Sequence, residues 1–78
     1  MNIYIGKFSP EILAEDLQEA FGAFGRVTFS QISKDWETGG SRGFGFVEMP
    51  NRTEAQNAIQ SILEIKGERV TVNEVNKN

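Results

Sequence analysis

Apolar and polar residues alternate in several short runs of the chain, and this period of two predicts β-strands. Between Asn2 and Gly6, Ile3 and Ile5 fall on one side of such a strand and Tyr4 falls on the other. Three similar runs, rich in Val, Thr, Phe or Ile, cover Arg26–Lys34, Gly43–Met49 and Arg69–Glu74. We therefore expect four strands.

Two segments between these runs have the apolar spacing of amphipathic helices. In the first, apolar residues recur every three or four positions, at Leu13, Leu17, Ala20, Phe21 and Phe24. We expect Ser9 to cap this helix, Pro10 to occupy its first turn and Gly25 to end it. The second helix has its apolar stripe at Ala55, Ala58, Ile59 and Ile62. Asn51 and Glu54 before that stripe predict a capping box.

The predicted elements follow the order β-α-β-β-α-β. That order is typical of a ferredoxin-like α+β sandwich, in which two helices cover one face of a four-stranded antiparallel sheet. Residues 35–41 and the pair Lys66-Gly67 are expected to form turns. No linker or repeat divides residues 1–78, so we expect a single domain whose last residues, Asn76 to Asn78, are frayed.

Strand alternation assigns three aromatic rings to the face of the sheet that the helices leave bare. If Val47 points to the helices, Phe46 and Phe44, one and three positions before it in the strand, lie on the other face. Tyr4 faces the same way from the first strand, which neighbours the third in this fold. Exposing a large apolar side chain forgoes about 1.5 to 3 kcal/mol, so the rings need a reason to be there. They either bind a ligand, bind a protein or lie beneath a missing tail.

Two runs of residues resemble the signature peptides of the RNA recognition motif (RRM) family. Arg42-Gly43-Phe44-Gly45-Phe46-Val47-Glu48-Met49 closely resembles the octapeptide of that family, and Ile3-Tyr4-Ile5-Gly6-Lys7-Phe8 is similar to its hexapeptide. The resemblance spans the chain and is nearest to small stand-alone bacterial members. It implies the same fold and the binding of single-stranded RNA, with single-stranded DNA as a second ligand, in post-transcriptional regulation or RNA chaperoning.

The resemblance also implies which residues contact RNA. Bases stack on Tyr4, Phe44 and Phe46, and Arg42 pairs with a phosphate. Further side chains are expected on or near the same face, namely Asn2, Lys7, Gln31, Glu48, Arg69, Thr71 and Asn73. Gly45 is expected to serve packing. Phe29 either joins the rings as a fourth or turns inward at a bulge.

The chain departs from the family's pattern at several positions. Lys7 stands where Asn is usual, Met49 where Phe or Tyr is usual, and Leu13 where Thr often caps the first helix. In the loop before the octapeptide, Trp36 and Gly40 replace basic residues, which should weaken contacts with phosphates. Trp36 either folds over the sheet edge or offers a further surface for base stacking.

Charge favours a second hypothesis, an RRM-fold module that binds protein and binds RNA weakly or not at all. The chain has 8 Lys and Arg against 11 Asp and Glu, a net charge of −3 that is unusual in a nucleic-acid binder. Four acids gather in the first helical segment, Glu11, Glu15, Asp16 and Glu19. We therefore expect the charge to be polarised, with the strands more basic than that helix.

Other functions find little support in the composition. The chain has no Cys and no His, so disulfides, Ser-His-Asp catalysis and thiolate or histidine metal sites are impossible. We expect no enzyme activity, no cofactor and no metal. With no apolar run long enough to span a bilayer and no leader after Met1, we expect a cytoplasmic monomer that does not enter membranes.

Overall fold

The computed structural model describes residues 1–75, and for Ser41 and Arg42 it describes only the backbone. The end expected to be frayed, Asn76 to Asn78, lies outside the described residues. The elements are β1 (Asn2–Gly6), α1 (Ala14–Gly22), β2 (Phe29–Lys34), β3 (Ser41–Glu48), α2 (Arg52–Ser61), β4 (Glu64–Ile65), β5 (Glu68–Arg69) and β6 (Thr71–Val75). The predicted β-α-β-β-α-β order is confirmed, with the short β4–β5 hairpin added before the last strand.

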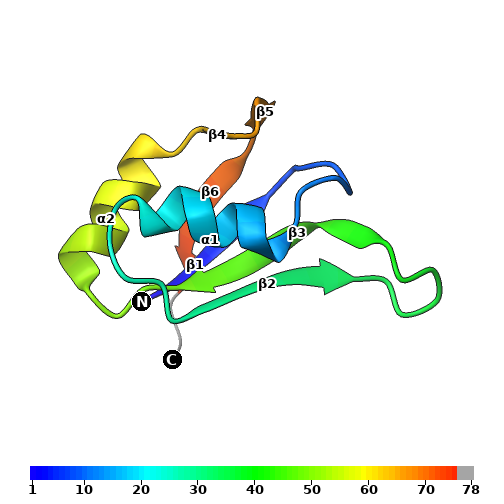
Figure 1. The fold of residues 1–78 in the computed structure, drawn as a ribbon, viewed down its shortest axis with the longest axis horizontal. Helices are drawn as coiled ribbons and strands as arrows, with labels where there is room; N and C mark the ends of the chain where they lie inside the picture. The colour runs from blue at the N-terminus through cyan, green and yellow to red at the C-terminus, as the bar shows by residue number, and fades with distance from the viewer. Residues whose placement is uncertain (76–78) are drawn as a thin grey trace.

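The four longer strands form one antiparallel sheet in the order β2-β3-β1-β6, and β4 pairs with β5 separately. Figure 1 shows both helices packed on one side of this sheet, α1 over β2 and β3 and α2 towards β6. The fold is therefore the predicted ferredoxin-like α+β sandwich with two helices on one face.

Apolar side chains from the sheet and the helices form the core between these two layers. Ile3 and Ile5 of β1, Val47 of β3, and Leu17 and Phe21 of α1 belong to one cluster and are 0–1% exposed. Since successive side chains of a strand point to opposite faces, burial of these isoleucines and this valine directs the residues between them away from the helices.

The first helix begins later than the sequence predicts. α1 starts directly after Leu13, its N-cap, so the expectation of a Ser9 cap followed by Pro10 is wrong. The hydroxyl and the backbone N–H of Ser9 donate instead to the carboxylate of Glu68, at 2.5 and 2.8 Å. Leu13 has no side-chain acceptor, but its own N–H donates to the Asp16 carboxylate at 2.8 Å. The partner of Ser9 is 59 residues away, beyond the reach of a local pattern.

Boundaries around the second strand also differ from the prediction. α1 ends before Gly25, and β2 begins at Phe29 rather than at Arg26. The irregularity in the ladder between β2 and β3 falls between Ile32 and Lys34, not at Phe29. The strand is shorter than the β-favouring segment that starts at Arg26. Pairing with β3 sets the length of β2, and the β-propensity of single residues does not.

The cap of the second helix and the turn near the end of the chain follow the sequence closely. Asn51 caps α2 by accepting the N–H of Glu54 at 2.9 Å, as predicted. The Glu54 carboxylate, however, accepts the N–H of Arg26 at 3.2 Å rather than that of Asn51, so the predicted capping box is only half formed. Lys66 and Gly67, with φ of 52° and 80°, form the predicted turn and close the β4–β5 hairpin. Arg69 pairs with Glu64 in this hairpin, so its assignment to the last strand of the sheet is wrong.

We expect the contact between Ser9 and Glu68 to make the stability of the fold depend on pH. Hydrogen bonds from the Ser9 hydroxyl and then from its backbone N–H lower the pKa of Glu68 from the ordinary value of 4.5. A carboxylate with a lowered pKa stabilises the fold at neutral pH, and this contribution disappears as the pH falls through the pKa of the folded state. We expect Glu68→Gln to lower the melting temperature at neutral pH and to match the unmodified chain once that carboxyl is protonated.

The measurement is thermal unfolding of both chains from pH 7 down to about pH 3. Glu19→Gln is the matched control, because Glu19 is an exposed acid of α1 whose loss leaves the Ser9 contact intact. A difference in melting temperature that stays constant over this pH range would contradict the role given to Glu68.

Candidate functional site

Three aromatic rings lie in contact with one another on the side of the sheet opposite the helices. Tyr4 comes from β1 and Phe44 and Phe46 come from β3, and all three side chains are half-buried. The ring centre of Tyr4 is 5.9 Å from each phenylalanine ring, and the two phenylalanine rings are 6.1 Å apart. These spacings are favourable for tilted and edge-to-face pairs. We call these three residues the aromatic platform.

The strand register places further side chains beside the aromatic platform, out to both edges of the sheet. Tyr4 pairs with Phe46 on one side and with Asn73 on the other, and Phe46 also pairs with Gln31 of β2. Directly paired residues share one face of a sheet. The amides of Gln31 and Asn73 therefore flank two rings of the platform in a row that crosses all four strands.

Two further rows run beside this one. On one side lie Phe29, Glu48, Asn2 and Val75, and on the other lie Phe44, Gly6 and Thr71. The structure thus brings together most of the side chains that the sequence singled out, namely Asn2, Tyr4, Gln31, Phe44, Phe46, Glu48, Thr71 and Asn73. Val75 also shares this face. Gly6 shares it too but was missed, although strand alternation alone places Gly6 on the side of Tyr4.

The three basic candidates lie apart from these rows or cannot be placed. Lys7 follows β1, is exposed and has φ of 65°, a left-handed conformation that Asn adopts more readily than Lys. Arg69 lies in the β4–β5 hairpin rather than in the four-stranded sheet. Arg42 belongs to β3 by its backbone, but its side chain lies outside the described part of the chain.

The sequence left two positions open for each of Phe29 and Trp36, and in the structure both side chains are exposed. Phe29 is 51% exposed and pairs with Glu48, which places it on the open face rather than in the core. Trp36 is 89% exposed, so its ring does not fold over the edge of the sheet. Both rings therefore remain accessible to a partner.

Gly6 allows the ring of Tyr4 to lie close to the sheet. A Cβ atom at Gly6 would stand 2.8 Å from Cζ and 2.9 Å from Cε1 of Tyr4, closer than real Cβ atoms approach other heavy atoms. Gly6 is accordingly buried although it lies on the open face. The signal for this role is a glycine two positions after an aromatic residue in the same strand.

Gly45 serves strand packing, as predicted. A Cβ atom at this position would collide with the carbonyl oxygen of Gln31 and stand 3.2 Å from Cα of Ile32. The absence of a side chain at Gly45 therefore lets β3 approach β2 closely directly beside the platform.

The acids of α1 and the described rows of the open face lie on opposite sides of the sheet. Those rows hold no basic side chain, however, so the predicted basic character of the strands stays a prediction. Within the described rows of the open face, Glu48 is the one acid, and its carboxylate accepts a hydrogen bond from the Thr28 hydroxyl at 3.0 Å. The acids of α1 lie on the opposite side of the sheet, and Asp16 pairs with Lys66 at 3.5 Å. Screening acts over about 8 Å at physiological salt, so the α1 acids have little influence on the open face.

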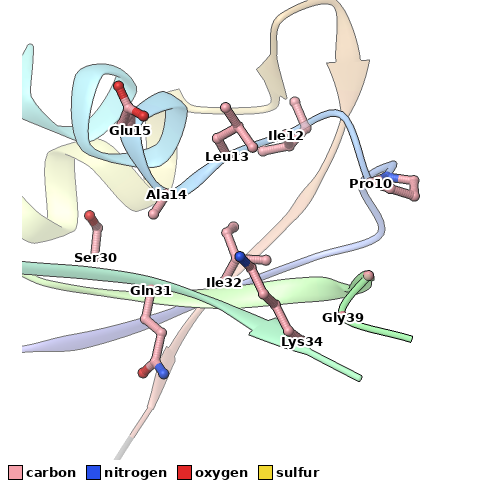
Figure 2. A pocket seen from close by; sticks show the side chains of 11 residues that line it. Pro10, Ile12, Leu13, Ala14, Glu15, Ser30, Gln31, Ile32, Lys34 and Gly39 are labelled. Atoms are coloured by element: carbon pink, nitrogen blue, oxygen red, sulfur yellow. The ribbon is translucent and has the colours of Figure 1, made fainter. Parts of the chain in front are cut away.

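A cavity of about 540 Å³ lies at the outer edge of β2, away from the platform. Figure 2 shows Leu13 and Ala14 on its α1 side and Ile32 on its sheet side, while Gln31 points away from α1. Within residues 1–75 there is no cluster of acids that could hold a metal ion. Over the same residues, no helix has both the length and the apolar composition needed to cross a bilayer.

An open-faced α+β sandwich with an aromatic platform on its middle strands is the class that this geometry defines. Residues 3–71 match the family model of the RNA recognition motif. Protein RbpE of Nostoc sp. is 44% identical over 80% of this chain and 63% of its own length. Oligouridylate-binding protein 1A of Arabidopsis thaliana is 38% identical over 99% of this chain and 17% of its own length.

A solved structure entitled RNA Binding Protein PG1 superposes on the whole chain with a TM-score of 0.93 and 39% identity, covering 96% of that protein. The chain belongs to the RNA recognition motif family. It spans less than two-thirds of the length of the two curated relatives named above.

We expect Gly6→Ala to displace the Tyr4 ring, because the added methyl group would occupy the space of that ring. NMR spectra should show loss of the contact between the Tyr4 ring and residue 6, and changed ring-current shifts at Phe44 and Phe46. Gly22→Ala is the matched control, since nothing lies within 4 Å of a Cβ there. Unchanged Tyr4 ring signals in Gly6→Ala would show that the ring does not rest on Gly6.

Proposed function

We propose that this protein binds single-stranded RNA by stacking bases on the aromatic platform. The observation that carries the proposal is the position of Tyr4, Phe44 and Phe46, which contact one another on the sheet face opposite the helices. Each base that stacks on an aromatic ring contributes about 1 to 3 kcal/mol, and every base has a face that can do so.

The chemistry of the platform favours single strands over duplexes. The bases of a duplex are stacked on one another and paired, so they cannot lie flat on protein rings, whereas unpaired bases can. Gln31 and Asn73 at the two ends of the central row carry amides that donate and accept hydrogen bonds. We propose that they read the edges of bases held by the rings, together with Asn2 and Thr71.

Membership of the family and the names of two similar proteins support this proposal. PG1 is named as an RNA-binding protein, and the Arabidopsis relative is named for oligouridylate. An oligouridylate is therefore the first ligand to test, with single-stranded DNA of matching sequence to assess the ribose. We further propose that residues 1–78 act as one domain in the cytoplasm, with Arg42, Lys7 and Arg69 near phosphates, and without a catalytic step.

A protein-interaction module is the second candidate, favoured by the net charge of −3. Salt separates the two candidates. Binding that involves phosphates weakens steeply as salt rises, because counterions are released, whereas burial of an aromatic surface by a protein does not.

We expect replacement of Phe44 and Phe46 together by Ala to weaken binding of oligouridylate by about thirtyfold or more, since two stacking surfaces are lost. The measurement is fluorescence anisotropy with a labelled oligonucleotide. The fold should persist, because truncating a fully buried ring such as Phe21 costs about 3 to 5 kcal/mol, and the platform rings are only half-buried.

Replacement of Phe44 and Phe46 together by Leu is the sharper control, because leucine keeps apolar contacts on the sheet but has no aromatic face. It should lose RNA affinity as the alanine variant does while unfolding closer to the unmodified chain. Native affinity in a folded double leucine variant would refute stacking on the platform.

We expect Arg42→Ala to weaken binding to a similar extent for all sequences, as loss of a phosphate contact should. The slope of log affinity against log salt should become shallower by about 0.7, the value for one phosphate of a single strand. Arg52→Ala, at the start of α2 on the far side of the sheet, is the control and should leave this slope unchanged. A loss confined to certain sequences would instead place Arg42 on a base.

A further inference from the structure

Trp36 is the most exposed of the large apolar side chains described in this chain. Its exposed fraction is 89%, against 51% for Phe29, 52% for Leu13 and 63% for Leu63. It is the one tryptophan of the sequence and lies in the turn that joins β2 to β3. Because the indole is almost fully exposed, little of its large apolar surface is buried within the domain, and that surface is available to a partner.

The turn that carries this indole is held in one shape by its own hydrogen bonds. The backbone N–H of Asp35 donates to the carbonyl of Gly40, and that of Gly39 donates to the carbonyl of Asp35, both at 2.7 Å. The Asp35 carboxylate accepts the N–H of Glu37 at 2.8 Å, and Gly39 has the left-handed φ of 74° that such a turn requires. Trp36 is therefore presented on a preorganised turn, which lowers the entropy cost of binding.

The charge of this turn argues against attraction of phosphates. Between Lys34 and Arg42 the only charged residues are Asp35 and Glu37, both acids. The uncharged face of the indole is thus what the turn offers to a polyanion. A base can stack on that face while its phosphates point away from the two acids.

The position of the turn connects it to the platform. Figure 1 shows the β2–β3 hairpin reaching out beyond the rest of the sheet, and β3 carries Phe44 and Phe46. Gln31 of β2 flanks the platform through its pairing with Phe46, and β2 runs on from Gln31 to the turn. In the proposed complex, RNA that leaves the platform past Gln31 continues towards the turn, because β2 and β3 both lead to it.

We propose that Trp36 is a further base-binding residue, which stacks on a nucleotide outside the platform in the same single-stranded RNA. This inference rests on the proposed function. The contact comes from stacking and not from charge, so its contribution to affinity is independent of salt and tolerant of base identity. It also requires an oligonucleotide long enough to reach from the platform to the turn.

The lone tryptophan permits a direct test in the unmodified chain. Tryptophan emission is recorded during titration with oligouridylates of roughly 4 and roughly 12 nucleotides. Stacking on a base should quench Trp36 when the longer oligonucleotide binds and leave its emission largely unchanged with the shorter one. Anisotropy of labelled oligonucleotides measures binding to the whole domain in parallel.

Variants then measure the contribution of the indole to affinity. Trp36→Ala should weaken binding of the longer oligonucleotide between about fivefold and about a hundredfold, by the same factor at about 50 mM and about 200 mM salt. It should have little effect on the shorter one, and Trp36→Phe should restore part of the loss. Glu37→Gln, a neighbour that changes charge and not stacking, should bind RNA equally well or slightly more tightly.

The outcomes separate this inference from the proposed function. If RNA binds in a manner that depends on Phe44 and Phe46 but Trp36 emission and the Trp36→Ala affinity are unchanged, the inference is overturned and the platform stands. A loss in Trp36→Ala that diminishes at high salt would also overturn it, since charge would then carry the contact. If neither oligonucleotide binds the unmodified chain, the proposed function itself fails.

Discussion

Packing of both helices against a single side of the sheet is the constraint on which the rest of this structure depends. Ile3, Ile5 and Val47 must turn inward to meet α1, and the period of two in a strand then leaves Tyr4, Phe44 and Phe46 no other direction than outward. The same contacts that stabilise the fold therefore create the surface proposed to bind RNA.

Two glycines make the close packing of this surface possible, because a Cβ atom at either position would clash with its neighbours. Gly6 leaves room for the ring of Tyr4 to lie against β1, and Gly45 lets β3 approach the backbone of β2 beside Phe46. Rings that contact one another and the sheet lose less side-chain entropy on binding than rings that project freely into water. The glycines of the two signature peptides thus serve the geometry of the aromatic residues as much as that of the backbone.

Stacking, rather than charge, is the dominant interaction that this surface can offer. The chain is acidic overall, but most acids of its first helical segment lie in α1, behind the sheet, and only Glu48 stands among the rows of the open face that the structure describes. The turn between β2 and β3 has the same character, because its exposed indole lies between two acids and offers stacking without positive charge. In the proposed complex the protein holds bases by their faces and depends on few phosphate contacts, which distinguishes it from strongly basic nucleic-acid binders.

Local chemistry in the sequence determined the order of the elements, the face on which the rings lie, the Asn51 cap and the Lys66-Gly67 turn. Each depends on residues within a few positions of one another, and the signature peptides added the family. Only the tertiary structure decided where α1 starts, because Ser9 is engaged by Glu68 from the other end of the chain. It alone also showed that Tyr4 rests on Gly6, that Arg69 pairs outside the main sheet and that the indole of Trp36 stands free of its edge. These features depend on contacts between segments that are distant in the sequence, or on whether other side chains cover an exposed residue. Neither can be recognised from the spacing of apolar and polar residues.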